Sequence, residues 1–215
     1  MNQSRIFSYP LRFPTLKISS AGLNPINPEK YNAFIFTSAN AIRNLRLSKT
    51  DNKKLCFCVG VITEKIVRQK GYNNTISAGG TVNALKNLII NSDQINKKSN
   101  LAYFCGDNLS SELDIELGKE GINVEKIVNY RSEKIKSLNE ENKKIILNNP
   151  PDLIFVYSVR SAESFIEIAK NYSLYTLMTD SKVMCISSKV LEIFKLNGWK
   201  NLELFDPGNE LLKLK

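Results

Sequence analysis

The chain has 215 residues, 42% of them hydrophobic and 24% charged, with 30 Lys and Arg against 21 Asp and Glu. This composition indicates one large or two small globular domains and excludes a disordered, collagen-like or coiled-coil protein. No apolar run approaches the ~20 residues of a membrane span, and the first residues lack the apolar core of a secretory signal. The net charge of +9 favours anionic partners over cationic ones.

One unit recurs along the chain: a short apolar strand, a small polar turn and a helix with apolar residues at helical spacing. In chain order the predicted strands are residues 33–37, 55–59, 101–105, 153–157 and 183–186. They are continuous apolar runs, as expected for parallel strands buried on both faces. Three of the helices reach a glycine, at Gly71, Gly121 and Gly198, which predicts C-caps. The alternation predicts an α/β fold with parallel sheets.

The two halves of the chain resemble each other. NAFIFTSANAIRNL aligns with DLIFVYSVRSAESF, which matches Ser38 with Ser158, and CVGVITEKIVRQKGY aligns with CISSKVLEIFKLNGW. An internal duplication is the economical interpretation, and it predicts two similar doubly wound domains. Residues 1–31 contain strand-like pieces but no strand–helix pair, so the second domain is expected to lack one such unit.

The cysteine and histidine content limits the metal sites and catalytic mechanisms that the chain can have. Cys56, Cys58, Cys105 and Cys185 form no CxxC pair, and the chain has no histidine. A Cys/His zinc site and every histidine-based catalytic triad are therefore excluded, and we expect no metal. Scattered reduced thiols favour the cytoplasm. Proton chemistry is left to Asp, Glu, Tyr, Lys, water or the backbone.

In open parallel sheets, ligands bind beyond the carboxyl ends of the strands, where helix N-termini attract anions. The turns at these ends contain Ser38, Ala39, Asn40, Gly60 to Thr63, Gly80, Thr81, Gly106, Ser158 to Ser161, Ser187 and Ser188. If two domains face each other, the turns line a cleft for a large ligand with several carboxylates or phosphates. Taken singly, each turn is also explained by ordinary helix capping.

Three further side chains have two interpretations each. Arg160 lies in a strand–helix turn, where it can bind a carboxylate or simply be solvated. Tyr130 ends an apolar stretch before a charged segment, so its hydroxyl can reach a cleft or its ring can pack at a domain boundary. Asp107 is a possible acid or an ordinary turn residue.

The pattern resembles one family, uroporphyrinogen-III synthase, over Lys17 to Trp199. The segments that carry the resemblance are FIFTSANAIRNL (34–45), CVGVITEKIVRQKGY (58–72), YFCGDNLSSELDIELGKEGINVEKIVNYRS (103–132), DLIFVYSVRSAESF (152–165) and CISSKVLEIFKLNGW (185–199). The TSxNA turn, the G-x-x-T element with its later glycine, and the Y-R-S end are diagnostic together.

This resemblance implies two α/β domains joined by a two-stranded linker, with residues 17–129 in one domain and 1–16 plus 130–215 in the other. It implies a cytoplasmic, monomeric lyase that cyclises the linear tetrapyrrole hydroxymethylbilane, inverts ring D and releases water. The resemblance implies no cofactor, nucleic acid or membrane, and the polycarboxylate substrate agrees with the basic charge.

The resemblance also implies roles for individual residues. Tyr130 matches the family's cleft tyrosine and is expected to assist departure of the substrate hydroxyl. Thr63, Ser38 and Ser158 match residues of the family's turns. With them, we expect Ala39, Asn40, Gly80, Thr81, Gly106, Arg160, Ser187, Ser188 and Lys189 to bind substrate.

The chain departs from the family pattern in three places. Ser187, Ser188, Lys189 and Val190 stand where a second G-x-x-T turn is common. The region of Ser110 lacks an arginine often found after the third strand, and an opening strand with its helix is missing. Either translation begins upstream of Met1 or the domain is trimmed. The alternatives to a synthase are a non-catalytic or degenerate two-domain binder of a polyanionic small molecule and, more remotely, a nucleic-acid-binding protein.

Overall fold

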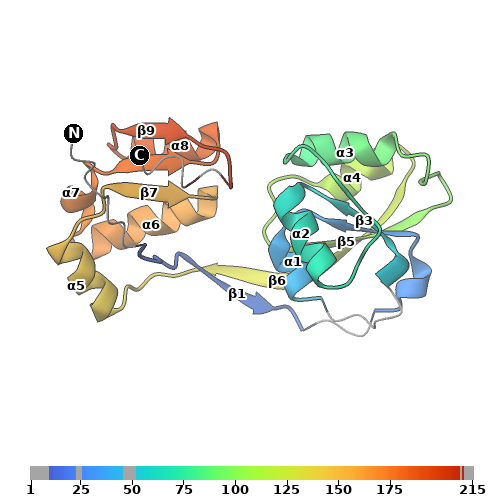
Figure 1. Cartoon of the computed structure of the whole chain (residues 1–215), viewed down its shortest axis with the longest axis horizontal. Helices are drawn as coiled ribbons and strands as arrows, with labels where there is room; N and C mark the ends of the chain where they lie inside the picture. Colours follow the sequence, from blue (N-terminus) through green and yellow to red (C-terminus); the bar gives the residue numbers. More distant parts are fainter. Residues whose placement is uncertain (1–9, 23–25, 46–51, 209, 211–215) are drawn as a thin grey trace, which may run out of the picture. The chain divides into compact units, whose positions relative to one another are not determined.

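The computed structural model describes residues 10–22, 26–45, 52–208 and 210, and it divides the chain into two compact units (Figure 1). Unit 1 comprises residues 1–17 and 133–215, and unit 2 comprises residues 18–132. The chain passes between them in strands β1 (Leu16–Ser20) and β6 (Asn123–Lys134), which are neighbours in one sheet. Thr15 O accepts from Ile135 N at 2.9 Å, and Asn129 O accepts from Ala21 N at 3.2 Å, so the two strands run antiparallel.

Unit 2 has a six-stranded sheet in the order β1-β6-β5-β2-β3-β4. The pairs β5–β6, β5–β2, β2–β3 and β3–β4 are all parallel. Its further strands are β2 (Ala33–Phe36), β3 (Leu55–Cys58), β4 (Thr75–Ser77) and β5 (Asn100–Gly106). Its helices are η1 (Pro28–Lys30), α1 (Ala39–Arg43), α2 (Val61–Gln69), α3 (Val82–Ile90) and α4 (Leu113–Lys119).

Both faces of this sheet are covered at its centre, which explains why β2 and β3 are apolar at every position. Phe34 and Phe36 pack with α1 and α2, whereas Ala33 and Ile35 on the same strand pack with α3 and α4. Figure 1 shows the two helix pairs on opposite sides of the sheet. This is the doubly wound arrangement that alternating strands and helices predict.

Unit 1 has a smaller parallel sheet, with three strands among the described residues in the order β7-β8-β9. Its elements are α5 (Glu140–Asn148), β7 (Leu153–Val156), α6 (Val159–Asn171), α7 (Tyr175–Met178), β8 (Lys182–Cys185), α8 (Ser188–Leu196) and β9 (Leu202–Leu204). Trp199 lies in its core, with its ring centroid 5.2 Å from that of Phe194, and its indole nitrogen donates to Met178 O at 2.9 Å.

The internal resemblance corresponds to matching local structure. Ser38 and Ser158 are both N-caps, of α1 and α6, and both accept a backbone hydrogen bond from the following helix. The predicted glycine C-caps are confirmed, because Gly71, Gly121 and Gly198 have φ values of 100°, 80° and 86°. Within the described residues, no helix is both long enough and apolar enough to cross a bilayer.

Candidate active site

The carboxyl ends of the parallel strands in unit 2 bring five predicted site positions to one edge of the sheet. Across that edge they follow the strand order: Tyr130 on β6, Gly106 at the end of β5, Ser38 after β2, Gly60 after β3 and Gly80 after β4. Ser38 and Gly106, which are 68 positions apart in the chain, thus follow neighbouring strands of one parallel sheet, the arrangement in which ligands bind beyond the carboxyl ends.

Two side-chain hydrogen bonds fix the turn after β2. Ser38 Oγ accepts from Asn40 N at 3.1 Å and caps α1, while Ala39 opens the helix. Thr37 Oγ1 is hydrogen-bonded at 3.0 Å to the hydroxyl of Tyr103, a buried residue of β5. Burial raises the pKa of Tyr103 to about 12, so its phenol stays protonated at neutral pH. This bond fixes the turn against the next strand.

The turns after β3 and β4 lie against each other. A Cβ on Gly60 would lie 3.2 Å from Gly80 Cα, so the close approach of the two backbones depends on glycine. Gly80 itself has φ of 90°, and Thr81 Oγ1 accepts from Ala84 N at 3.1 Å to cap α3. These turns therefore present backbone at the sheet edge rather than bulky side chains.

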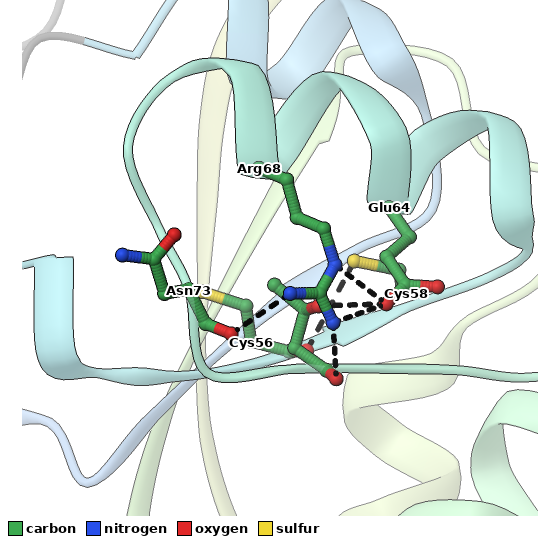
Figure 2. A network of polar contacts seen from close by, with 6 residues as sticks. Cys56, Cys58, Glu64, Arg68 and Asn73 are labelled. Atoms are coloured by element: carbon green, nitrogen blue, oxygen red, sulfur yellow. Dashed lines mark hydrogen bonds and ion pairs between the residues drawn. The ribbon is translucent and has the colours of Figure 1, made fainter.

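A polar network fastens α2 to β4 and so fixes both turns (Figure 2). Glu64 Oε1 accepts from Arg68 Nη2 at 2.9 Å and from Thr75 Oγ1 at 2.7 Å. Arg68 Nη1 also donates to Asn73 O at 3.0 Å. Figure 2 shows these groups beside the thiol of Cys58. Hydrogen bonds from Thr75, Ser77 and Arg68 lower the pKa of Glu64, which remains ionised at neutral pH.

Tyr130 lies directly against the end of β5. A Cβ built on Gly106 would lie 2.6 Å from Cζ and 2.9 Å from the hydroxyl oxygen of Tyr130, so the missing side chain leaves the space that the ring occupies. The β5–β6 register shifts at this point, and Gly106 pairs with Tyr130 after Cys105 has paired with Val128. Tyr130 is partly buried.

The carboxyl edge of unit 1 carries the second set of predicted residues. Ser158 Oγ accepts from Ser161 N at 3.0 Å to cap α6, and Ser187 Oγ accepts from Val190 N at 3.4 Å to cap α8. Ser188 is exposed in the first turn of α8. The capping interpretation of these serines is confirmed, and their contact with substrate stays a prediction.

Thr63 and Val190 occupy the same helical position in the two units. Each is the third residue of its helix, and their exposed fractions are 6% and 1%. In α2 the N-cap Gly60 makes no side-chain hydrogen bond, whereas in α8 Ser187 caps the helix through the Val190 amide. The change from G-x-x-T to S-x-x-V thus places a valine at a buried position and supplies a serine cap.

The first turns of α6 and α8 carry the charge expected of an anion site, whereas those of α2 and α4 contain acidic residues. The helices α3, α6 and α8 have no acidic residue in the first turn, whereas α5 begins with Glu140 and Glu141. Arg160 and Lys189 lie instead in the first turns of α6 and α8. A cation at a helix N-terminus opposes the helix dipole, and a bound carboxylate relieves that opposition.

The four thiols are not arranged for nucleophilic chemistry. Each is a free, buried cysteine. Burial raises the pKa of Cys58 to about 12 and those of Cys105 and Cys185 to about 11, so they stay protonated at neutral pH.

The hollows in the surface of unit 2 lie away from these turns. One hollow of about 460 Å³ is lined by Asn32, Lys54, Leu55 and Asn74, among others. These residues precede or begin β2, β3 and β4, at the amino edge of the sheet. The turns of Ser38, Gly60 and Gly80 lie at the opposite, carboxyl edge, which therefore remains the better candidate.

One residue that supports the site, Asn129, was not predicted from the sequence. Asn129 has an exposed fraction of 0% and donates through Nδ2 to Ala41 O at 2.7 Å, which ties α1 to the strand that carries Tyr130. Its Oδ1 is buried without a hydrogen-bond partner. The sequence feature that could have indicated Asn129 is its position as a polar residue between Val128 and Tyr130 in an apolar stretch.

A family model described as uroporphyrinogen-III synthase HemD matches residues 8–203. No curated protein matches significantly. Among solved structures, a uroporphyrinogen-III synthetase from Helicobacter pylori matches with a TM-score of 0.64 and 18% identity, covering 94% of this chain and 91% of the other. A mutant uroporphyrinogen III synthase from Thermus thermophilus matches with a TM-score of 0.55 and 15% identity, covering 95% and 86%. At these identities the structural matches show the fold, a two-domain α/β fold with parallel sheets.

Proposed function

The chain belongs to the uroporphyrinogen-III synthase family, and on this premise we propose how its residues carry out the family's reaction. The protein is a cyclising lyase of tetrapyrrole biosynthesis that acts on a small molecule, the linear tetrapyrrole hydroxymethylbilane. The family match over residues 8–203 carries this assignment. The residue roles below are proposals supported by the geometry of the sheet edges.

The substrate carries several carboxylates, and we assign them to the helix N-termini. In unit 2 the candidates are the turns of Ser38, Ala39 and Asn40 and of Gly80 and Thr81, which present backbone amides. In unit 1 they are the turns of Ser158 and Arg160 and of Ser187, Ser188 and Lys189. Arg160 and Lys189 add positive charge to these turns, where a substrate carboxylate can bind.

The reaction begins with loss of the terminal hydroxyl, which leaves an azafulvene cation stabilised by its pyrrole nitrogen. Tyr130 donates a hydrogen bond to the departing oxygen, which leaves as water once protonated. The substituted α-carbon of ring D then bonds to the azafulvene methylene and forms a spiro intermediate. Its bond to the methylene of ring C breaks, which regenerates an azafulvene on ring C. The other α-carbon of ring D bonds to that methylene and loses its proton, which gives the inverted ring. The protein contributes position and electrostatics rather than covalent catalysis.

The four free thiols support a place of action in a reducing compartment, and we propose the cytoplasm. We also propose that the enzyme works as a monomer without nucleic acid. Size-exclusion chromatography with light scattering tests the oligomeric state, and a mass near 48 kDa, about twice the 24.3 kDa of the chain, would contradict it.

Replacing Tyr130 tests the catalytic assignment. We expect Tyr130→Phe to lower kcat for isomer III formation by at least about 10-fold, because the phenyl ring keeps the packing and loses the donor. The assay supplies hydroxymethylbilane enzymatically, subtracts the enzyme-free blank and separates the oxidised uroporphyrin isomers. Full turnover by a folded Tyr130→Phe protein would refute the role of Tyr130. Bilane binding without any isomer III from the wild type would favour the non-catalytic binder.

A further inference from the structure

The contact between Gly106 and Tyr130 involves the hydroxyl end of the tyrosine side chain. The atoms nearest to a Cβ on Gly106 would be Cζ at 2.6 Å, Cε2 at 2.7 Å and the hydroxyl oxygen at 2.9 Å. A real Cβ essentially never approaches heavy atoms so closely, so any side chain at position 106 must displace the phenol. The clash falls on the far end of one side chain, which can rotate, and not on backbone.

Asp107 holds the strand on the C-terminal side of Tyr130. Its backbone amide donates to Tyr130 O at 3.1 Å, and its Oδ1 accepts from Ser132 N at 3.1 Å. Asn108 Nδ2 donates to the same carboxylate oxygen at 2.8 Å and orients it. One residue after β5 therefore fixes the β6 backbone from Tyr130 to Ser132.

The strand is also fixed on the other side of Tyr130. Asn129, the preceding residue, is fully buried and donates to Ala41 O at 2.7 Å. Asn129 and Asp107 fix the backbone on either side of Tyr130, and the ring, which also packs against the core beside β2 and β3, occupies the space that Gly106 leaves open. A fixed donor is what a reaction controlled by positioning requires.

We infer that Gly106 and Asp107 form the seat of Tyr130, acting as positioning residues that hold its hydroxyl in place for the reaction. Gly106 does this by lacking a side chain, and Asp107 by bonding the backbone that directly follows Tyr130. This inference rests on the proposed role of Tyr130. It differs from the expectation that Gly106 binds substrate, because a positioning role predicts a change in kcat and a binding role predicts a change in KM.

The first test is Gly106→Ala with Gly118→Ala as the matched control. Gly118 lies in α4, and a Cβ there meets nothing within 4 Å. We expect Gly106→Ala to lower kcat for isomer III formation about 10- to 100-fold with KM changed less than about 2-fold. Gly118→Ala should keep both parameters at the wild-type values. A raised KM with unchanged kcat in Gly106→Ala would overturn the seat and favour direct substrate contact.

The second test separates the carboxylate of Asp107 from the fold. Asp107→Ala removes the acceptor for Ser132 N, whereas Asp107→Asn keeps an oxygen at the same position. We expect kcat to fall about 10-fold in Asp107→Ala and to be largely restored in Asp107→Asn, with both melting temperatures close to that of the wild type. Equal kcat in Asp107→Ala and the wild type would overturn the role of Asp107.

The double variant distinguishes failure of the seat from failure of the proposed function. If Gly106 acts through the phenol, Gly106→Ala added to Tyr130→Phe should lower kcat by less than about 2-fold further. Independent losses that multiply would overturn the seat while leaving the role of Tyr130 intact. Full kcat in Tyr130→Phe alone would overturn both.

Discussion

Two glycines in this chain lie where a tyrosine leaves no room for a side chain. Gly106 faces the ring of Tyr130 at the carboxyl edge of unit 2, and the exposed Gly198 faces the hydroxyl of Tyr175, which packs against the core of unit 1. The tyrosine hydroxyl in the second pair donates to the backbone oxygen of Asn197, so it cannot turn aside without losing that bond. The first pair is thus suited to positioning and the second to stability.

We expect Gly198→Ala to destabilise the protein by about 1–3 kcal/mol. Gly198 has φ of 86°, and its Cβ would lie 2.6 Å from Tyr175 Oη. For a chain of this size, that corresponds to a fall in melting temperature of about 2–4 °C per kcal/mol. Differential scanning calorimetry measures it, with Gly118→Ala as the control that should be neutral or slightly stabilising. An unchanged melting temperature in Gly198→Ala would contradict this account.

The sequence predicted the place of the candidate residues in the fold better than their contacts. Ser38, Ser158, Ser187 and Thr81 were expected in strand–helix turns, and each caps a helix there. The buried position of Thr63 was not foreseen, because burial depends on how α2 packs and not on local pattern. The register shift that pairs Gly106 with Tyr130 was equally hidden, since it arises between strands remote in sequence.

At the scale of elements, the central strands were predictable to within about two residues, and the short edge strands were not. Continuous apolar runs marked β2, β3, β5 and β8, which have a strand on each side, and also β7, an edge strand of four residues. The edge strands β4 and β9 have three residues each and no residue that is fully buried. Tertiary pairing, rather than local composition, determines such short strands.

The Glu64 network makes the attachment of α2 to β4 dependent on pH. The pKa of Glu64 in the folded protein lies below the ordinary value of 4.5. The ionised carboxylate therefore stabilises the fold fully above about pH 4.5, and this stabilisation is lost as the pH falls through the folded-state pKa. We expect Glu64→Gln to lower the free energy of unfolding by about 1 kcal/mol at pH 7 and by progressively less below pH 4.5. Urea unfolding across this range measures the difference.

A matched control for this prediction is Glu140→Gln. Glu140 lies 3.9 Å from Lys143 with 74% of its side chain exposed, so its removal should change stability by less than about 0.5 kcal/mol at either pH. A Glu64→Gln deficit that is the same at acidic and neutral pH would show that the charge of Glu64 does not matter.

At the scale of the whole molecule, the chain presents two related sheets of unequal size that carry matching turns. Unit 2 has six strands and unit 1 has three among the described residues. Both place serine-capped helices at the carboxyl ends of their strands, and unit 1 adds Arg160 and Lys189. The net charge of +9 and these turns agree with a substrate bearing several carboxylates. Tyr130 lies on the strand by which the chain leaves unit 2.

The most direct measurement is the isomer composition of the product. Porphobilinogen and hydroxymethylbilane synthase generate the bilane, this protein is added, and the oxidised uroporphyrins I and III are separated by chromatography. The bilane closes unaided to isomer I, so the enzyme-free reaction is the reference. The account predicts that isomer III predominates when the 215-residue chain is present. Isomer I at the reference level, from protein shown to be folded by circular dichroism, would contradict it.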